Sequence, residues 1–412
     1  MAERSGATGN EQNASVKEIW QSPANRLMAL AIALVAVAAS YLWLRDDGWG
    51  HEWGLSRAWQ LILVVVFGLV AAWCCLYVLF RPRQRLEDLC RVTGPLDLED
   101  YVASGLAPLP PDADPRQLYL DQVKRAVCNI IYGDPPFWFY DGTRPVLASG
   151  FSLARRVRGE DSPSSAHTMV GVRRLDSLQS CMERVLRDNV PGDLIETGSY
   201  RGGATIFMRA VLKAHQVSDR RVFVCDTFVP PSPPQPPVLV MPIIQALAAI
   251  PSRAWQRQYF LFLQRLPKQY QAFPDLQDPS DDFVRFLMWN LRNPVAFNRV
   301  ENTNLDVVKS NFARYGLLDE QVLFLQGFFA DTLPEAPIER LAIVRLDGDT
   351  YESTWDAITV LYPKLSPGGY LIVDDYQSFS DCEKAIQDYR QQHDIDEEIE
   401  PIDNLAVFWR KS

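Results

Sequence analysis

The sequence has few of the residues from which thiolate metal sites and disulfide frameworks are built. Seven cysteines are spread over 412 residues without a Cys-x-x-Cys pair, and there are only four histidines. Neither a zinc–thiolate site nor a disulfide framework is therefore indicated. Positive charge is also not in excess, because 41 Lys and Arg residues face 51 Asp and Glu residues, for a formal net charge of −10. This balance argues against a general nucleic-acid-binding protein.

Two common phosphate-binding motifs are missing as well. The chain has neither the Gly-x-Gly-x-x-Gly fingerprint of nicotinamide dinucleotide sites nor a phosphate loop ending in Gly-Lys-Ser/Thr. The composition, with 47% hydrophobic and 22% charged residues, is nevertheless that of a globular protein. A chain of this length has room for a catalytic domain and one or two smaller parts.

The N-terminal part contains two long apolar runs, Leu27–Leu44 and Trp59–Phe80. A transmembrane helix needs about 20 predominantly apolar residues, and neither run has the polar stripe of a helix packed on a soluble core. We therefore expect a two-helix transmembrane hairpin over residues 25–82. Basic residues gather before the first run and after the second, so both termini and the catalytic domain are expected on the cytoplasmic side.

The rest of the chain divides into three expected parts. Residues 1–24 are read as a flexible cytoplasmic tail, and residues 83–190 as a helical lead-in that forms a cofactor and substrate lid. From residue 191 to residue 412 apolar strands alternate with helices, which predicts an α/β fold with a doubly wound, mostly parallel sheet. A stretch without strands, at about 229–300, is expected to be a helical insertion. The predicted strands are 193–197, 222–225, 322–325, 341–346, 370–373 and 406–409.

The first strand of this pattern runs into a glycine loop, in the segment DLIETGSYRGG. Ligands of open α/β sheets bind beyond the carboxyl ends of the strands, where such loops lie. Glu196 precedes the first glycine and suits a cation, and Asp226 ends the next strand, where it can accept from both hydroxyls of a ribose. A nucleoside with a cationic amino-acid part is S-adenosylmethionine. The candidate cofactor-binding residues are Glu196, Thr197, Gly198, Ser199, Gly202 and Asp226.

A group of aspartates follows two later strands. Asp347 and Asp349 lie in RLDGDTYEST, and Asp374 and Asp375 lie in IVDDY. Neighbouring parallel strands are about 4.8 Å apart, so these carboxylates should meet at one edge of the sheet. Hard oxygen ligands without nearby thiolate or histidine suit Mg²⁺ or a similar cation. The alternative is helix capping, in which Asp349 caps the following helix.

These motifs together resemble the macrocin O-methyltransferase family. The resemblance is carried from about Asn129 to the C-terminus by NIIYGDPP, AHTMVGVRRLDSLQ, VPGDLIETGSYRGGATIFMRAVLKAH, the segment NFARYG to DGDTYEST, and LYPKLSPGGYLIVDDY. It implies a class I methyltransferase fold, which is Rossmann-like, and methylation of sugar hydroxyls with S-adenosylmethionine and Mg²⁺. It also implies that Asp331 lies near the adenine and that the metal ligands are Asp347, Asp374 and Asp375.

Two features depart from the family pattern and concern the acceptor. The segment before the AHTM motif reads GEDSP, with Ser162 where the family has Trp. The stretch after Asp226 is replaced by the Pro-rich insertion, and the two apolar runs lie outside the resemblance. The general base stays open among His167, Asp349 and Tyr351. The acceptor is expected to be a small molecule or a glycan, with membrane lipid as a further partner, and a homo-oligomer is left open.

Two other functions are weighed against methyl transfer. Asp347-Gly348-Asp349 can be read as the Asp-x-Asp site of a metal-dependent glycosyltransferase, but that reading leaves the glycine loop and Asp226 unexplained. The chain can also be a non-catalytic membrane scaffold on a methyltransferase fold. A scaffold predicts loss of the acidic residues, all of which are present.

Overall fold

The computed structural model describes residues 98–229 apart from 107, 110, 141–144 and 148–149, and also residues 250, 252–265, 281, 284, 287, 288 and 303–412. They belong to one compact unit, Gln84–Gln235 with Ala248–Ser412. The tail and both apolar runs lie outside the described residues. Within the described part of the chain, no helix has the length and apolar character needed to span a membrane.

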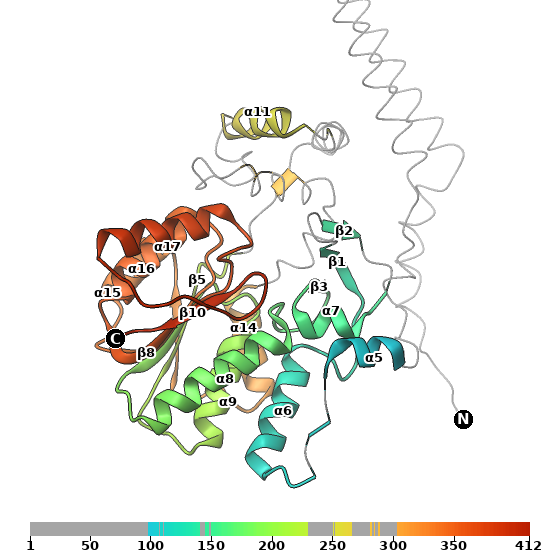
Figure 1. Ribbon diagram of the computed structural model, residues 1–412, viewed down its shortest axis with the longest axis vertical. Helices are drawn as coiled ribbons and strands as arrows, with labels where there is room; N and C mark the ends of the chain where they lie inside the picture. Colours follow the sequence, from blue (N-terminus) through green and yellow to red (C-terminus); the bar gives the residue numbers. More distant parts are fainter. Residues whose placement is uncertain are drawn as a thin grey trace, which may run out of the picture. The chain divides into compact units, whose positions relative to one another are not determined.

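A seven-stranded mixed sheet forms the centre of the fold (Figure 1). The strand order is β6-β5-β4-β7-β8-β10-β9, and the first five of these strands run parallel. Strands β4 (Asp193–Thr197) and β7 (Leu341–Leu346) have the predicted bounds. The other strands are β5 (Val222–Asp226), β6 (Val322–Gln326), β8 (Leu365–Val373), β9 (Glu400–Pro401) and β10 (Val407–Arg410).

The prediction of a mostly parallel sheet is confirmed, but the last two strands break the pattern. β10 pairs antiparallel with β8 and with β9. Only a few residues join β9 to β10, and such a short connection can only join antiparallel strands. Asp403 stabilises this turn by accepting from the backbone N–H groups of Leu405 and Ala406, both at 2.8 Å.

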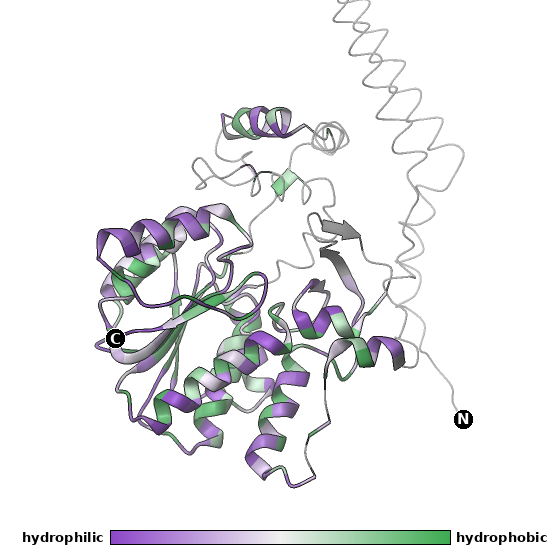
Figure 2. Ribbon diagram, viewed as in Figure 1, coloured by the Kyte–Doolittle hydropathy of each residue, from purple (hydrophilic) through white to green (hydrophobic). Residues whose placement is uncertain are grey.

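Helices cover both faces of the sheet (Figure 1). One layer holds α8 (Gly171–Arg187), α9 (Gly203–Ala214) and α14 (Leu305–Arg314), and the other holds α15 (Phe329–Glu335), α16 (Tyr351–Leu361) and α17 (Ser380–Gln392). The strands are apolar and the helices are two-faced, with polar residues outward (Figure 2). β7 is buried along its whole length, so the side chains at its carboxyl end lie inside the fold.

The lead-in before the sheet is not purely helical. It contains α5 (Leu98–Ser104), α6 (Pro115–Val127) and α7 (Leu153–Arg158). It also contains an antiparallel sheet of order β2-β1-β3, formed by Pro145–Leu147, Pro136–Tyr140 and Asp161–Pro163. The sequence does not predict this sheet, because its strands are short and each contains a proline. Among the described residues of the stretch 229–300, Arg253–Gln264 form the helix α11.

Candidate active site

The three aspartates proposed as metal ligands come together at the carboxyl edge of the sheet. Asp347 follows β7, and Asp374 and Asp375 follow β8. One carboxylate oxygen of each lies within 4.8 Å of the others. Asp374 and Asp375 are buried and Asp347 is half-buried. Parallel pairing of β7 with β8 explains the meeting, because Leu346 and Val373 are partners in register.

A buried arginine lies among these carboxylates. Arg345 of β7 is 2% exposed. Its Nη1 donates to Glu196 and, at 2.7 Å, to Asp347, while its Nη2 donates to Asp374. A buried charge is tolerated only when it is paired and hydrogen-bonded, and here three carboxylates surround one guanidinium. Arg345 therefore supplies a positive charge from the chain itself, which offsets part of the negative charge of these carboxylates.

A second arginine reaches the group from the covering helix. Arg174 of α8 donates through Nη1 to Asp374 at 2.6 Å and through Nε to Asp403 at 2.7 Å. Burial raises the pKa of Asp374, but Arg174 and Arg345 outweigh it and hold that pKa below its usual range. Asp374 is thus an ionised carboxylate held on both oxygens.

The other three aspartates of the group, Asp347, Asp349 and Asp375, hold protons more tightly than usual. Burial and the neighbouring Asp349 and Asp347 raise the pKa of Asp375 well above its ordinary value. Burial, followed by the charge of Asp347, raises the pKa of Asp349 to about 7. Two guanidinium groups do not balance this many carboxylates, so in the cation-free site bound protons neutralise part of the remaining negative charge.

The residues present fit a divalent cation. Asp375 Oδ2 is buried and has no hydrogen-bond partner among the described residues. All the candidate ligand atoms are carboxylate oxygens, which Mg²⁺ prefers. The capping alternative does not account for Asp349, because Thr350 is the N-cap of α16 and accepts from Ser353 N–H at 3.2 Å. Asp349 instead has a φ of 60°, a conformation that is uncommon outside glycine and is found at functional sites.

The glycine loop lies directly against this group. Gly198 has a φ of +84°, and a Cβ there would lie 1.7 Å from the carbonyl oxygen of Asp347. Any side chain at position 198 would therefore clash with the backbone of Asp347, and only glycine fits there. Glu196 and Thr197 are buried at the end of β4, and Glu196 Oε2 and Thr197 Oγ1 have no partner in the described part of the chain. Burial raises the pKa of Glu196 to about 8, against the opposing effect of Arg345. A bound cofactor with donor groups would satisfy these orphaned atoms.

Asp226 ends β5 beside the same loop. Its Oδ2 accepts from Ser199 N–H at 2.9 Å, and its Oδ1 accepts from Phe228 N–H at 3.0 Å. Burial raises its pKa despite these bonds. Each oxygen also accepts a longer bond of 3.4 Å, Oδ2 from the Ser199 hydroxyl and Oδ1 from the Thr227 hydroxyl, so the hydroxyls of a ribose would take the place of these two donors. Gly202 has a φ of 85° and is the N-cap of α9. The exposed Asp331 lies in the first turn of α15, beyond the neighbouring strand β6.

The structure separates the three candidates for the general base. Asp349 belongs to the acidic group. The Tyr351 hydroxyl donates to Asp388 of α17 at 2.9 Å, and its ring stacks on Trp355. His167 Nδ1 is hydrogen-bonded to the Tyr315 hydroxyl at 2.9 Å. Neither Tyr351 nor His167 has its hydrogen bond within the acidic group, because a neighbour on another element holds each of them.

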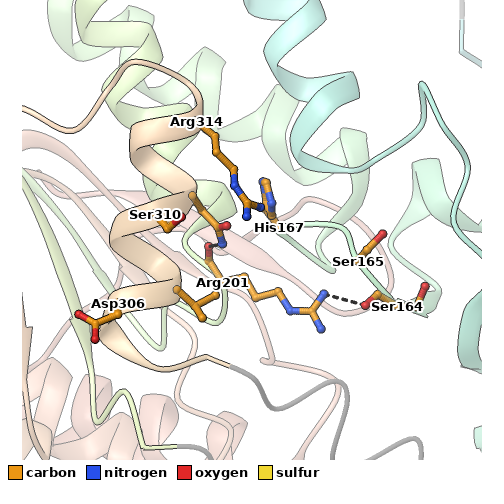
Figure 3. Close-up of a pocket in the computed structure, with 9 residues that line it drawn as sticks. Ser164, Ser165, His167, Arg201, Asp306, Ser310 and Arg314 are labelled. Carbon is orange, nitrogen blue, oxygen red and sulfur yellow. Dashed lines mark hydrogen bonds between the residues drawn. The ribbon is translucent and has the colours of Figure 1, made fainter. Parts of the chain in front are cut away.

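His167 lines a separate pocket of about 520 Å³ (Figure 3). Arg314 lies beside its ring, and Arg201 points to the loop before it, where Nη1 donates to the carbonyl oxygens of Ser164 and Ala166 at 3.2 and 3.0 Å. Burial, together with the charges of these two arginines, lowers the pKa of His167 to about 4. His167 is therefore neutral at physiological pH.

The comparison with known protein families decides the class of this molecule. Residues 117–287 and 294–411 match the family model described as macrocin O-methyltransferase (TylF). The chain belongs to the macrocin O-methyltransferase family. It is an S-adenosylmethionine-dependent O-methyltransferase. The match includes residues 229–287, so most of the stretch read from the sequence as an insertion lies inside the family match.

Characterised relatives support this family membership. The chain is 44% identical over 299 residues to the Streptomyces olivaceus 8-demethyl-8-(2,3-dimethoxy-alpha-L-rhamnosyl)-tetracenomycin-C 4'-O-methyltransferase, covering 72% of this chain and 94% of that protein. It is 41% identical to the mycinamicin III 3''-O-methyltransferase of Micromonospora griseorubida, covering 72% and 97%. Among solved structures, the O-methyltransferase NovP matches with a TM-score of 0.53 and 37% identity, covering 72% of this chain and 99% of NovP.

Within this family fold, the two arginines are the site residues that reasoning from motifs missed. Arg345 had a readable signal, because it is the only charged residue in the otherwise apolar strand LAIVRL. A charge in a buried strand, two residues before an aspartate on the same face, indicates an ion pair at the strand end. Arg174 had no such signal, since its position on α8 reads as an ordinary polar residue of a two-faced helix.

The neutral state of His167 predicts a loss of stability on acidification. The pKa of His167 is about 4 in the folded protein, below the ordinary value of 6.5. Between these two values the unfolded chain binds a proton that the folded protein does not, so the free energy of unfolding decreases as the pH is lowered. Between pH 7.5 and 5.5 this histidine should cost about 1.4 kcal/mol. We expect His167→Asn to remove that part of the pH dependence in urea unfolding. His393→Asn, at an exposed histidine, is the control. If the free energy of unfolding of His167→Asn depends on pH as steeply as that of the wild type, the assignment is wrong.

Proposed function

We propose that this methyltransferase transfers the methyl group of S-adenosylmethionine to a sugar hydroxyl of a glycosylated small molecule or glycan, with the assistance of Mg²⁺ or a similar cation. The observation that carries the proposal is the meeting of Asp347, Asp374 and Asp375 beside the glycine loop. The named activities of the relatives, on a rhamnosyl tetracenomycin and on mycinamicin III, support a sugar as the acceptor.

The residues of the site divide the work between cofactor and acceptor. Asp226 and Glu196 would hold the ribose and the amino group of the cofactor, since Asp226 ends β5 beside the glycine loop and Glu196 Oε2 is buried without a partner among the described residues. Asp347, Asp374 and Asp375 would hold the cation, which when bound lowers the pKa of a nearby hydroxyl and orients it. Positioning both reactants next to each other accounts for a large part of the acceleration in a two-substrate displacement.

Asp349 is the proposed general base. It takes the proton of the acceptor hydroxyl as the hydroxyl oxygen attacks the methyl carbon. A C–O bond forms while the C–S bond breaks, and the electron pair of that bond stays on sulfur, which becomes neutral. Asp349 suits this role because it alone of the three candidates lies within the acidic group, where burial and the charge of Asp347 raise the pKa of its carboxyl in the cation-free site to about 7.

The acceptor class is tested with labelled S-adenosylmethionine and paired acceptors. We expect label transfer to a rhamnosylated polyketide or a macrolide glycoside, with a mass gain of one methyl group on the sugar fragment. The matching aglycones are the control and should gain none. Transfer to the aglycone would contradict a sugar acceptor. Transfer from a UDP-sugar, in place of methyl transfer, would favour the glycosyltransferase reading of Asp347-Gly348-Asp349.

We also propose that the chain is anchored to the membrane by residues 25–82, with both termini and the catalytic domain in the cytoplasm. The support is the sequence alone, namely the two apolar runs and the basic residues that flank them. Sodium carbonate extraction of membranes should leave the chain in the pellet, and protease added to spheroplasts should leave the catalytic domain uncut. Release into the carbonate supernatant would contradict the anchor.

A further inference from the structure

Arg345 connects the two halves of the site through one guanidinium group. Its three carboxylate partners come from three consecutive strands of the sheet, since Glu196 lies on β4, Asp347 directly after β7 and Asp374 directly after β8. The same nitrogen, Nη1, donates to both Glu196 and Asp347. A displacement of Glu196 therefore changes the hydrogen bond that holds Asp347.

Strand register explains why all four side chains share one face. Glu196 and Arg345 are partners in the parallel pair β4 and β7, and Arg345 pairs in register with Ile372 of β8. Side chains two residues apart on a strand point to the same face, so Asp347 lies on the face of Arg345 and Asp374 on the face of Ile372. Glu196 and Arg345 lie within the sheet, and Asp347 and Asp374 are the first residues beyond their strands, so the strands set the arrangement.

We propose that Arg345 is a positioning residue that presets the metal-binding carboxylates and couples them to the cofactor site through Glu196. The proposal rests on the proposed function, because it takes Asp347 and Asp374 as ligands of a divalent cation and Glu196 as a partner of the cofactor. Without Arg345, these carboxylates lose their shared donor and repel one another. With it, they keep the geometry of the site before a cation arrives.

The coupling follows from the shared nitrogen. A cationic group of the cofactor that attracts Glu196 weakens the hold of this carboxylate on Nη1, and the guanidinium then interacts more strongly with Asp347 and Asp374. Binding at one half of the site thus alters the ligands of the other half. Because coupling between binding sites is reciprocal, the cation must change cofactor affinity by the same factor.

The test is the binding of Mn²⁺, followed by electron paramagnetic resonance, to the full chain in detergent with and without S-adenosylhomocysteine. In the wild type we expect S-adenosylhomocysteine to change the Mn²⁺ dissociation constant by about fivefold or more. Arg345→Lys keeps the charge but has a single nitrogen in place of the two that separately hold Asp374 and the pair of Glu196 and Asp347. We expect it to weaken Mn²⁺ binding about 10- to 100-fold, the usual effect of losing a residue that orients metal ligands. In Arg345→Lys, S-adenosylhomocysteine should change the Mn²⁺ dissociation constant by less than twofold.

Arg209→Lys is the matched control. Arg209 of α9 is 4% exposed and is paired through two nitrogens with Asp319, at 2.9 and 2.6 Å, outside the acidic group. It should lose thermal stability and keep the Mn²⁺ affinity of the wild type. Three results would overturn this proposal without touching the proposed function. They are wild-type Mn²⁺ affinity in Arg345→Lys, an equal loss of Mn²⁺ affinity in Arg209→Lys, and an undiminished effect of S-adenosylhomocysteine on Mn²⁺ binding in Arg345→Lys. A wild type that binds S-adenosylhomocysteine but no Mn²⁺ would overturn the metal part of the proposed function as well.

Discussion

Replacing Asp375 by asparagine should lower methyl transfer by about 100-fold or more, and EDTA should have the same effect on the wild type. The carboxylate provides Oδ2, a buried oxygen that no described residue satisfies, and an amide is a poor substitute as a ligand of Mg²⁺. A bound cation contributes several kcal/mol to such a reaction, and 1.36 kcal/mol corresponds to a factor of ten. Added Mg²⁺ should restore the EDTA-treated wild type but not Asp375→Asn.

Stability and cofactor binding distinguish this loss from damage to the fold. The pKa of Asp375 is raised in the folded protein, so its ionisation costs stability as the pH rises above the value of the unfolded chain. Asparagine cannot ionise, and the metal-free variant should be at least as stable as the wild type at neutral pH. Calorimetry on the two metal-free proteins should show little change in S-adenosylhomocysteine affinity. Asp396→Asn, at an exposed carboxylate, is the control. Full activity of a metal-free, EDTA-treated enzyme would refute metal assistance.

Asp349→Asn is expected to reduce kcat by about 10²- to 10⁴-fold, the usual contribution of a general base. Asparagine has nearly the shape of aspartate and tolerates the positive φ of 60° at this position, so the backbone need not change. The dissociation constant of S-adenosylhomocysteine and the KM of the acceptor should stay close to those of the wild type.

The pH dependence of the rate provides an independent check of the same residue. The base must be ionised, and the pKa of Asp349 is raised to about 7, so the wild-type rate should rise as the pH increases through this region. A bound cation lowers that pKa and moves the rise to lower pH. The rise should be absent from the residual activity of Asp349→Asn. Tyr351→Phe and His167→Asn should retain most of the activity. A larger loss in either of them than in Asp349→Asn would assign the base to that residue.

The parts of the fold that follow from local sequence were predictable. β4 and β7 have the predicted bounds, because each is a short apolar run between turn residues. The meeting of Asp347 with Asp374 and Asp375 was predictable for the same reason, since residues that directly follow neighbouring parallel strands share one edge. The small sheet of β1, β2 and β3 was not predictable, because its strands are too short to show alternation and begin or end with proline.

The contacts of single side chains required the tertiary structure. His167 precedes the main sheet in sequence and reads as a site residue, but its bond to Tyr315 of the segment after α14 places it in another pocket. Tyr351 follows Asp349 by two residues, yet its position in the first turn of α16 directs its hydroxyl to α17. Sequence proximity fixes which element a residue belongs to, whereas the packing of elements decides what its side chain meets.

The sequence by itself therefore determined the class of fold, the edge of the sheet that carries the site, and the aspartates that gather there. These depend on periodicity and on the ends of strands, which are local properties of the chain. Only the tertiary structure decided that Arg345 and Arg174 neutralise part of the acidic group, and that Asp349 alone of the three candidate bases lies within it. These contacts join residues that are as many as 200 positions apart, as in the pair of Arg174 and Asp374. They arise from the register of β4, β7 and β8 and from the packing of α8 on the sheet, which no local pattern specifies.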